Sequence, residues 1–319
     1  MELIRYLHNI KDRHHGCVAT IGNFDGVHLG HQAVFQQLRR HALRLKLPAV
    51  VMIFEPQPLE YFSPDTAPAR LTGFREKIEW LQEHGIDRVI CLRFQQSLAA
   101  LSAEQFVEQL LVQALGVRYV IVGDDFRFGH GRQGNFRMMQ AFGRRYGFEV
   151  VATETLSSDG TRVSSSRIRD LLTAGRLEQA KNLLGRPYTI SGRVIHGDER
   201  GRKLGFPTAN MALKRRLSPL LGVYVVLVKG LREGIYNGVA NIGTRPVFDG
   251  KQLLLEVHLL DFNGDIYGQH LHVEFLKHLR AEKNFASVDQ LCAQMETDIE
   301  EARAFFKYLI QHRRLHGRR

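Results

Sequence analysis

The sequence predicts an α/β protein in which a doubly wound domain on a parallel sheet is followed by a small antiparallel β-barrel and a C-terminal helix. Three observations support this prediction. The chain has 319 residues, enough for about two domains. Its first half alternates short apolar runs with amphipathic stretches, and its second half is a series of β-rich segments separated by turns.

Five short apolar runs in residues 1–184 predict buried strands. Stretches of helical length separate them, and uniformly apolar strands joined by helices indicate parallel pairing through crossovers on both faces of one sheet. Two shorter helices, at about 166–174 and 176–184, close this half. The predicted strands span 17–22, 49–54, 88–92, 118–122 and 148–153, and the longer predicted helices span about 30–46, 73–84, 102–115 and 135–146.

Residues 185–319 show a different pattern, which begins after Gly185-Arg186-Pro187. The β-rich segments follow one another with turns that contain Gly, Asp or Asn between them, as in an antiparallel barrel. A final amphipathic stretch at about 287–311 predicts a helix packed on the outside of the barrel. We therefore expect a domain boundary between residues 184 and 185. The predicted strands span 188–195, 223–230, 236–243, 253–262 and 270–277.

The composition is that of a globular chain and excludes several classes of protein. Hydrophobic residues make up 44% and charged residues 24%, and no apolar run reaches the roughly 18 residues of a membrane span. The N-terminus has no apolar signal core, and Cys17, Cys91 and Cys292 lack metal-ligand spacing, so we expect a cytoplasmic protein with free thiols. The net charge of +11 is spread over both halves without interleaved aromatic residues. We therefore expect neither a membrane nor nucleic acid as a partner.

The most informative segment, Thr20 to His31, follows the first predicted strand and opens the first predicted helix. Doubly wound sheets bind ligands at this edge. His28 and His31 are three residues apart, so on a first helical turn they face the same side, beside free backbone N–H groups and the positive end of the helix dipole. The pair favours a phosphorylated ligand. Zinc is a weaker interpretation, because no third ligand residue stands at suitable spacing nearby.

A second phosphate-binding pattern, Val-Ser-Ser-Ser-Arg-Ile-Arg, occupies residues 163–169 after the last predicted strand of the sheet. Its hydroxyls can cap a helix or bind phosphate oxygens, and Arg167 and Arg169 supply positive charge. An ordinary helix cap is the structural alternative, and the position of the segment in the sheet favours phosphate binding.

Two other nucleotide motifs are misplaced or missing. Residues 129–134 fit GxGxxG, but they lie well past the fourth predicted strand rather than in the first βα turn, so an NAD site is disfavoured. The sequence contains no GxxxxGK[ST], which disfavours P-loop phosphoryl transfer.

In the second half, a polar and cationic loop at 197–205 leads into Gly205-Phe-Pro-Thr-Ala-Asn210. A glycine-containing loop of this kind can cover a triphosphate. Thr208 and Asn210 are two residues apart in an extended chain, so they share a face and offer hard oxygen ligands that suit Mg²⁺. A turn in which both side chains satisfy backbone groups is the structural alternative.

Glu256 lies inside the apolar run Leu-Leu-Leu-Glu-Val-His-Leu-Leu at residues 253–260. A carboxylate in apolar surroundings is destabilising unless it has a partner. Two interpretations remain open from the residues alone: a buried structural ion pair and a general base.

Four motifs, in order along the chain, resemble those of the bacterial bifunctional riboflavin kinase/FAD synthetases. The His-x-Gly-His spacing at 28–31 is similar to that of nucleotidylyltransferases. The longer segment 22–31, GNFDGVHLGH, resembles this family in particular. Residues 123–129 and 163–169 are similar to the family's G-x-[DN]-F-x-F-G loop and its triphosphate motif, and residues 205–210 match the GFPTAN of the kinase half.

The resemblance implies that the first half is a Rossmann-like nucleotidylyltransferase domain that transfers AMP from ATP to FMN and releases pyrophosphate. His28 and His31 would be the catalytic residues, stabilising charge on the reacting phosphates rather than acting as nucleophiles. The nucleotide-binding residues that the resemblance implies in this half are Gly22, Phe24, Asp25, Gly30, Asp125, Ser164, Ser165, Ser166 and Arg169.

For the second half, the resemblance implies a barrel like that of riboflavin kinase. Glu256 would take the proton from the ribityl 5′-hydroxyl, which attacks the γ-phosphate of ATP. Thr208 and Asn210 would bind Mg²⁺, and Gly205 and Pro207 would contact the nucleotide. Riboflavin, FMN and FAD would be substrates and products rather than resident cofactors.

Two functions of other kinds compete with this interpretation. In one, the chain is a nucleotidylyltransferase whose barrel only binds a ligand, which Glu256 beside Thr208 and Asn210 disfavours. In the other, the chain is a flavin- or nucleic-acid-binding module without catalysis, which would not need the paired histidines.

Overall fold

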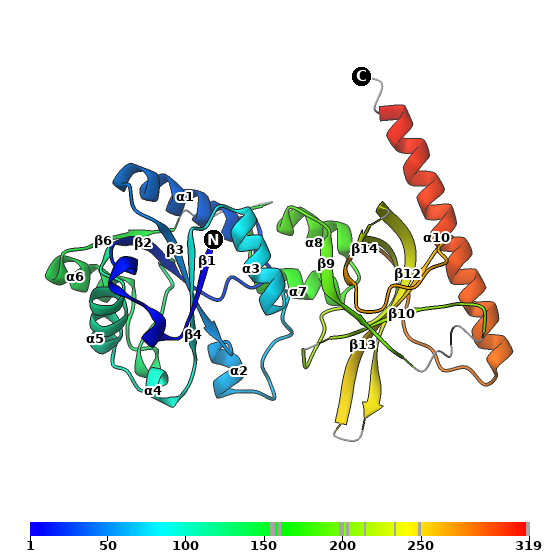
Figure 1. Ribbon diagram of the computed structural model, residues 1–319, viewed down its shortest axis with the longest axis horizontal. Coiled ribbons are helices and arrows are strands. Elements are labelled where there is room, and N and C mark those ends of the chain that lie inside the picture. Colours follow the sequence, from blue (N-terminus) through cyan, green and yellow to red (C-terminus); the bar gives the residue numbers. More distant parts are fainter. Residues whose placement is uncertain are drawn as a thin grey trace. The chain divides into compact units, whose positions relative to one another are not determined.

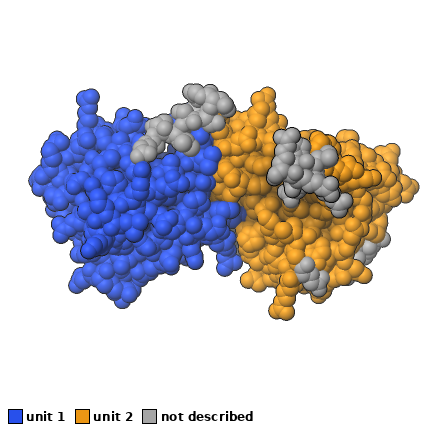
Figure 2. Space-filling model, turned by 90° about the horizontal axis from the view of Figure 1, so that it is seen from above, with its two compact units in different colours: residues 1–68, 74–164 blue, residues 69–73, 165–319 orange. Residues whose placement is uncertain are grey.

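The computed structural model describes residues 1–153, 157–158, 161–197, 201, 204–213, 215–232, 234–247 and 250–316. The chain forms two compact units (Figure 2). The first comprises residues 1–68 and 74–164, and the second comprises residues 69–73 and 165–319.

The first unit is built on a six-stranded parallel sheet in the order β1-β4-β3-β2-β5-β6 (Figure 1). The five predicted strands are confirmed within one or two residues, and the structure adds β1, which pairs with β4 at one edge. The strands are β1 Glu2–Arg5, β2 Cys17–Ile21, β3 Ala49–Glu55, β4 Arg88–Arg93, β5 Val117–Val122 and β6 Glu149–Ala152, with a separate pair β7 Ser157–Ser158 and β8 Thr161–Arg162.

Helices cover both faces of this sheet, as its uniformly apolar strands require. Phe35 of α1 and Val51 share a buried cluster on one face. Leu110 of η3 and Met52, the neighbour of Val51 on β3, share a second cluster on the other face. The helices are α1 Leu29–Leu45, α2 Pro58–Phe62, α3 Phe74–Glu83, α4 Gln96–Ala99, α5 Ala103–Phe106 and α6 Phe136–Tyr146, with short 3₁₀ turns η1 Leu7–Asn9, η2 Asp12–His14 and η4 His130–Arg132.

One predicted helix has a different local structure. The stretch at 102–115 forms α5 and then continues as a π-helix, η3 Val107–Ala114. Ser102 caps the start of this segment through a hydrogen bond from the backbone N–H of Gln105.

The second unit contains a closed antiparallel barrel in the order β10-β13-β12-β11-β14-β9. It confirms the predicted barrel and the C-terminal helix, and it adds β10. The two helices predicted at 166–174 and 176–184 are present, but they belong to this unit and not to the first. The elements of the second unit are α7 Ser165–Thr173, α8 Leu177–Leu184, β9 Tyr188–Ile195, β10 Ala209–Ala212, β11 Gly222–Leu231, β12 Gly234–Val247, β13 Gly250–Leu259, β14 His270–Arg280 and α10 Val288–His316.

Alternation along β13 explains the charged residue in its apolar run. Leu255 and Val257 are fully buried in the barrel interior, whereas Leu254, Glu256 and His258 line a cavity on the outer face. Helix α10 packs against this outer side through a buried cluster that joins Phe306 to barrel residues such as Val225. The run therefore has two faces with a period of two, and Glu256 is not in the barrel core.

Candidate active sites

The paired histidines lie where β2 leads into α1. His28 is the N-cap of α1, one position before the helix, and its Nδ1 accepts a hydrogen bond from the backbone N–H of His31 at 3.3 Å. The two rings are stacked, with centroids 3.5 Å apart and planes 18° apart. The expected pairing of the two side chains is therefore present, although only His31 belongs to the helix.

The loop before α1 adopts a constrained backbone. Phe24 and Val27 have φ angles of 46° and 42°, and Gly26 has 86°. A positive φ is unfavourable for a β-branched residue such as Val27, so the surrounding packing must hold it. The ring of Phe24 lies edge-on to that of His31, with centroids 5.2 Å apart, and Asp25 is buried. The loop thus holds the ring of His31 in place.

Gly30 allows two segments to approach closely. A Cβ at this position would lie 3.2 Å from the ring of His28 and 3.5 Å from the backbone carbonyl of Val163. Ser164, the first serine of the serine motif at residues 163–169, follows Val163 directly. Within the first unit, the structure therefore brings the start of that motif to the N-terminus of α1.

The rest of the serine motif belongs to the second unit. Ser165 opens α7, Ser166 is exposed and Arg169 is half-buried. The Nε of Arg169 donates a hydrogen bond to the backbone carbonyl of Ala69 at 2.6 Å. Arg169 thus fixes the segment 69–73 to α7.

Asp125 lies in the loop after β5, where its Oδ2 forms an ion pair with Arg162 at 2.8 Å. Both side chains are more than half exposed, and such a pair contributes little stability. In the part of the chain that the structure describes, no three His, Cys, Asp or Glu side chains come together as metal ligands. The zinc interpretation therefore gains no support there.

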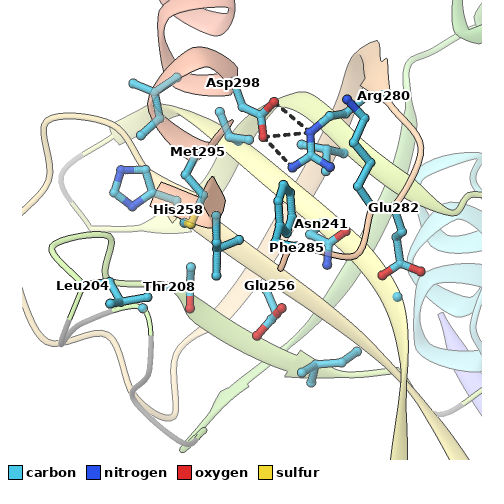
Figure 3. Close-up of a pocket in the computed structure, with 18 of the residues that line it drawn as sticks. Leu204, Thr208, Asn241, Glu256, His258, Arg280, Glu282, Phe285, Met295 and Asp298 are labelled. Carbon is cyan, nitrogen blue, oxygen red and sulfur yellow. Dashed lines mark hydrogen bonds and ion pairs between the residues drawn. The ribbon is translucent and has the colours of Figure 1, made fainter. Parts of the chain in front are cut away.

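The second unit contains a cavity of about 450 Å³ between the barrel and α10 (Figure 3). One row of paired residues crosses five neighbouring strands along its wall. Asn210 on β10 pairs with Glu256 on β13, and Glu256 pairs with Asn241 on β12. The row continues through Val223 on β11 to Arg280 on β14. Because paired residues project from the same face of a sheet, all five line the cavity.

Thr208 and Asn210 stand at one end of this row and have the chemistry of hard-cation ligands. Asn210 is buried, and its Nδ2 donates to the backbone carbonyl of Thr208 at 3.4 Å, which leaves Oδ1 as the atom for a ligand. His258 donates from Nδ1 to the carbonyl of Pro207 at 2.9 Å and so holds the segment against β13. Gly205 has a φ of 87°, which favours glycine. Residues 198–200 and 202–203 of the predicted triphosphate loop lie outside the described residues.

A largely buried ion pair lies at the other end of this row. The guanidinium of Arg280 binds Asp298 of α10 through Nε and Nη2, at 2.8 to 3.1 Å, and Gln294 donates to the same carboxylate at 3.0 Å. The ring of Phe285 lies 5.8 Å from this guanidinium, and Met295 projects from α10 into the same cavity (Figure 3). Sequence reasoning missed these residues, since a strand end, a loop and a helix bring them together.

The two halves of the chain match two different protein-family models. Residues 10–167 match the family model described as FAD synthetase, and residues 184–306 match the one described as riboflavin kinase. The two regions define a two-domain transferase with a nucleotidyltransferase part and a kinase part.

Full-length relatives identify the family more closely. The chain is 52% identical to the bifunctional riboflavin kinase/FMN adenylyltransferase of Escherichia coli K12, over 96% of this chain and 98% of the relative. It is 50% identical to the protein of that name from Haemophilus influenzae, over 96% and 99% of the two chains. The chain belongs to the bifunctional riboflavin kinase/FMN adenylyltransferase family, which confirms the predicted family and its two activities.

A solved structure has the same fold over nearly the whole chain. It is a crystal structure from Streptococcus pneumoniae described as a macrolide-efflux protein, with a TM-score of 0.79 and 31% identity over 95% of this chain and 99% of that one. Among the described helices of the present chain, none is long and apolar enough to span a membrane.

Proposed function

We propose that Glu256 is the general base of the riboflavin kinase reaction. Its carboxylate would accept the proton of the ribityl 5′-hydroxyl while that oxygen attacks the γ-phosphorus of ATP, and ADP leaves. The position of Glu256 carries this proposal: it lies in the cavity wall directly beside Asn210, on a strand whose alternate residues fill the barrel core. Gly205 and Pro207 would contact the nucleotide on the same side.

Mg²⁺ is the divalent cation we propose, held by Thr208 and Asn210. When bound, it would neutralise negative charge on the ATP phosphates. The oxygen donors of this pair are hard, and Oδ1 of Asn210 is oriented by the bond from its own amide nitrogen to Thr208. A site with two protein ligands fits Mg²⁺, which keeps waters and phosphate oxygens as its other ligands.

In the adenylyltransferase reaction, an FMN phosphate oxygen would attack the α-phosphorus of ATP, and pyrophosphate would leave. His28 and His31 would stabilise the charge that develops on the α-phosphate and on pyrophosphate, together with the N–H groups at the start of α1. Gly22, Phe24, Asp25 and Gly30 would shape this site. Asp125, Ser164, Ser165, Ser166 and Arg169 are the other nucleotide-binding residues that we propose.

One incubation tests both halves of the proposal. Riboflavin, ATP and Mg²⁺ are incubated with the purified chain, and the flavins are separated by chromatography. FMN should form first and FAD second, and FMN supplied directly should give FAD without riboflavin. Absence of both FMN and FAD would contradict the kinase assignment, and conversion that stops at FMN would contradict the adenylyltransferase assignment.

The boundary at residues 184 and 185 remains our proposal for the division between the two activities. Helix α8 contacts β9 and β14, and its residues Leu177, Leu183 and Leu184 are buried. A fragment of residues 185–319 should therefore melt at a lower temperature than a fragment of residues 165–319, because it exposes barrel surface that α8 covers. Both fragments should phosphorylate riboflavin. A folded fragment without kinase activity would contradict the proposed division.

Asp298→Asn should lower the melting temperature and raise the KM for riboflavin. The substitution leaves the guanidinium of Arg280 without its anionic partner, and removing one member of a buried pair costs about 3–5 kcal/mol. Thermal unfolding and steady-state phosphorylation measure the two effects.

Asp261→Asn is the matched control for this prediction. Asp261, which follows β13, pairs with Arg303 of α10, the helix that also carries Asp298. The side chains of Asp261 and Arg303 are 72% and 52% exposed. The interaction with Arg303 holds the pKa of Asp261 below its ordinary value, yet exposed pairs contribute little. Equal losses from the two variants would show that burial of the Arg280–Asp298 pair is not what matters.

We also propose a cytoplasmic location. Cys17, Cys91 and Cys292 form no disulfide, as fits a reducing compartment. Burial raises the pKa of Cys17 to about 12 and that of Cys91 to about 11, so neither is a thiolate at neutral pH.

A further inference from the structure

Asn241 is a polar residue of the kinase cavity to which neither the motifs nor the roles proposed above assign a function. It pairs with Glu256 across β12 and β13, on the side of Glu256 away from Asn210. Its neighbours on β12, Ala240 and Ile242, are fully buried in the barrel, so Asn241 belongs to the outer face and lines the cavity.

The carboxamide of Asn241 has an unused acceptor. Among the described residues, its buried Oδ1 has no hydrogen-bond partner. Buried polar atoms in folded proteins are nearly always hydrogen-bonded, and leaving one without a partner is destabilising. An acceptor of this kind in the wall of a cavity points to a donor on the ligand.

The two sides of Glu256 offer different chemistry to a ligand. Thr208 and Asn210 on one side supply the oxygens expected for a cation and the ATP phosphates. On the other side, the row passes from Asn241 to Val223, and the ring of Phe285 and Ile299 of α10 also line the cavity. The apolar side suits the ring system of a flavin.

The chemistry of Oδ1 of Asn241 indicates which of the two substrates, ATP or riboflavin, it can bind. An amide oxygen only accepts hydrogen bonds, and so do the ionised phosphate oxygens of ATP. The two cannot bond to each other. The ribityl hydroxyls of riboflavin can donate, and the ribityl chain must pass from the apolar side to Glu256 for its terminal hydroxyl to react.

We infer that Oδ1 of Asn241 accepts a hydrogen bond from a ribityl hydroxyl of riboflavin. This inference rests on the proposed kinase function of the cavity. The bond holds the ribityl chain beside Glu256, so Asn241 contributes both to the affinity for riboflavin and to the selection of flavins that carry a hydroxylated side chain.

The test compares riboflavin with lumiflavin, which has the same ring system with a methyl group in place of the ribityl chain. Asn241→Ala and Asn241→Leu remove the acceptor, and leucine nearly keeps the volume. Binding to the full-length chain is measured by the quenching of flavin fluorescence, and the KM for riboflavin is measured by phosphorylation. We expect about tenfold or more weaker binding of riboflavin in both variants and nearly unchanged binding of lumiflavin.

The control variant is Asn237→Ala. Asn237 lies four residues before Asn241 on β12, hence on the same face of the strand, and it is not among the residues that line the cavity. It should bind both flavins like the unaltered chain. The melting temperature of the barrel in all three variants shows whether they are folded, and formation of FAD from supplied FMN should be normal in each.

Two results would overturn the inference. Equal weakening of riboflavin and lumiflavin would mean that Asn241 contacts the ring or shapes the cavity, and unchanged binding of both would mean that it contacts neither. A failure of the kinase assignment itself looks different, because the unaltered chain would then make no FMN.

Discussion

Glu256→Gln is expected to lower the rate of riboflavin phosphorylation by about a hundredfold or more, because glutamine keeps the size of the side chain but cannot accept the proton. Binding of ATP with Mg²⁺ should change little, since Thr208 and Asn210 remain. Steady-state rates of FMN formation, measured at saturating riboflavin and ATP, test the expectation.

The structural alternative for Glu256 predicts a different outcome. If the carboxylate serves only as a buried partner, glutamine lowers the melting temperature and leaves the rate per folded molecule near normal. A destabilised but fully active kinase would refute the assignment of the base. FAD formation from supplied FMN should persist in the variant, because Glu256 is not among the residues assigned to that reaction.

The double substitution of His28 and His31 by alanine should reduce FAD formation by at least about a thousandfold. Each ring is assigned to donate to charge that develops in the transition state, and loss of one such donor typically costs a hundredfold or more. FMN formation from riboflavin should continue in the same protein. Chromatography of both flavins over time gives the two rates from one sample.

His15→Ala is a suitable control for the double variant. His15 is exposed and precedes β2, outside the loop that leads into α1. It should leave both rates unchanged. Normal FAD synthesis in the double variant would refute a catalytic role for the stacked pair, and loss of FMN formation as well would indicate that the whole chain is damaged.

The apolar periodicity predicted the larger helices and strands because their own residues carry the pattern. The runs of β2 and β3 are apolar except for Thr20 and Glu55, as is typical of strands with helices on both faces. The prediction missed β1 and β10, which are four residues each and lack a clear pattern. Parallel pairing with β4 defines β1, and closure of the barrel defines β10. Both strands therefore form because of pairing with strands that are distant in sequence.

The residues of the candidate sites also divide into those that a local sequence pattern indicates and those that depend on contacts between distant segments. Short motifs contain His28, His31, Thr208 and Asn210, and a charge in an apolar run marks Glu256. Asn241 gives a weaker signal, because an asparagine in a β-rich segment is informative only once its register with Glu256 is known. The pairing of Arg280 with Asp298 depends on how α10 packs against the barrel, which no local pattern specifies.

Because the residues from Asn210 to Arg280 lie in one row across neighbouring strands, their positions in the kinase site depend on the register of the barrel strands. A slip of β13 by a single residue would turn Glu256 into the interior and bring Leu255 or Val257 to the cavity wall. In an open sheet an edge strand can slip alone, whereas each strand of this closed barrel is bonded on both sides. Misalignment of one reactive group therefore requires breaking two ladders at once. Changes in specificity are accordingly easier to obtain in the loop that carries Phe285 than by insertions or deletions within the strands.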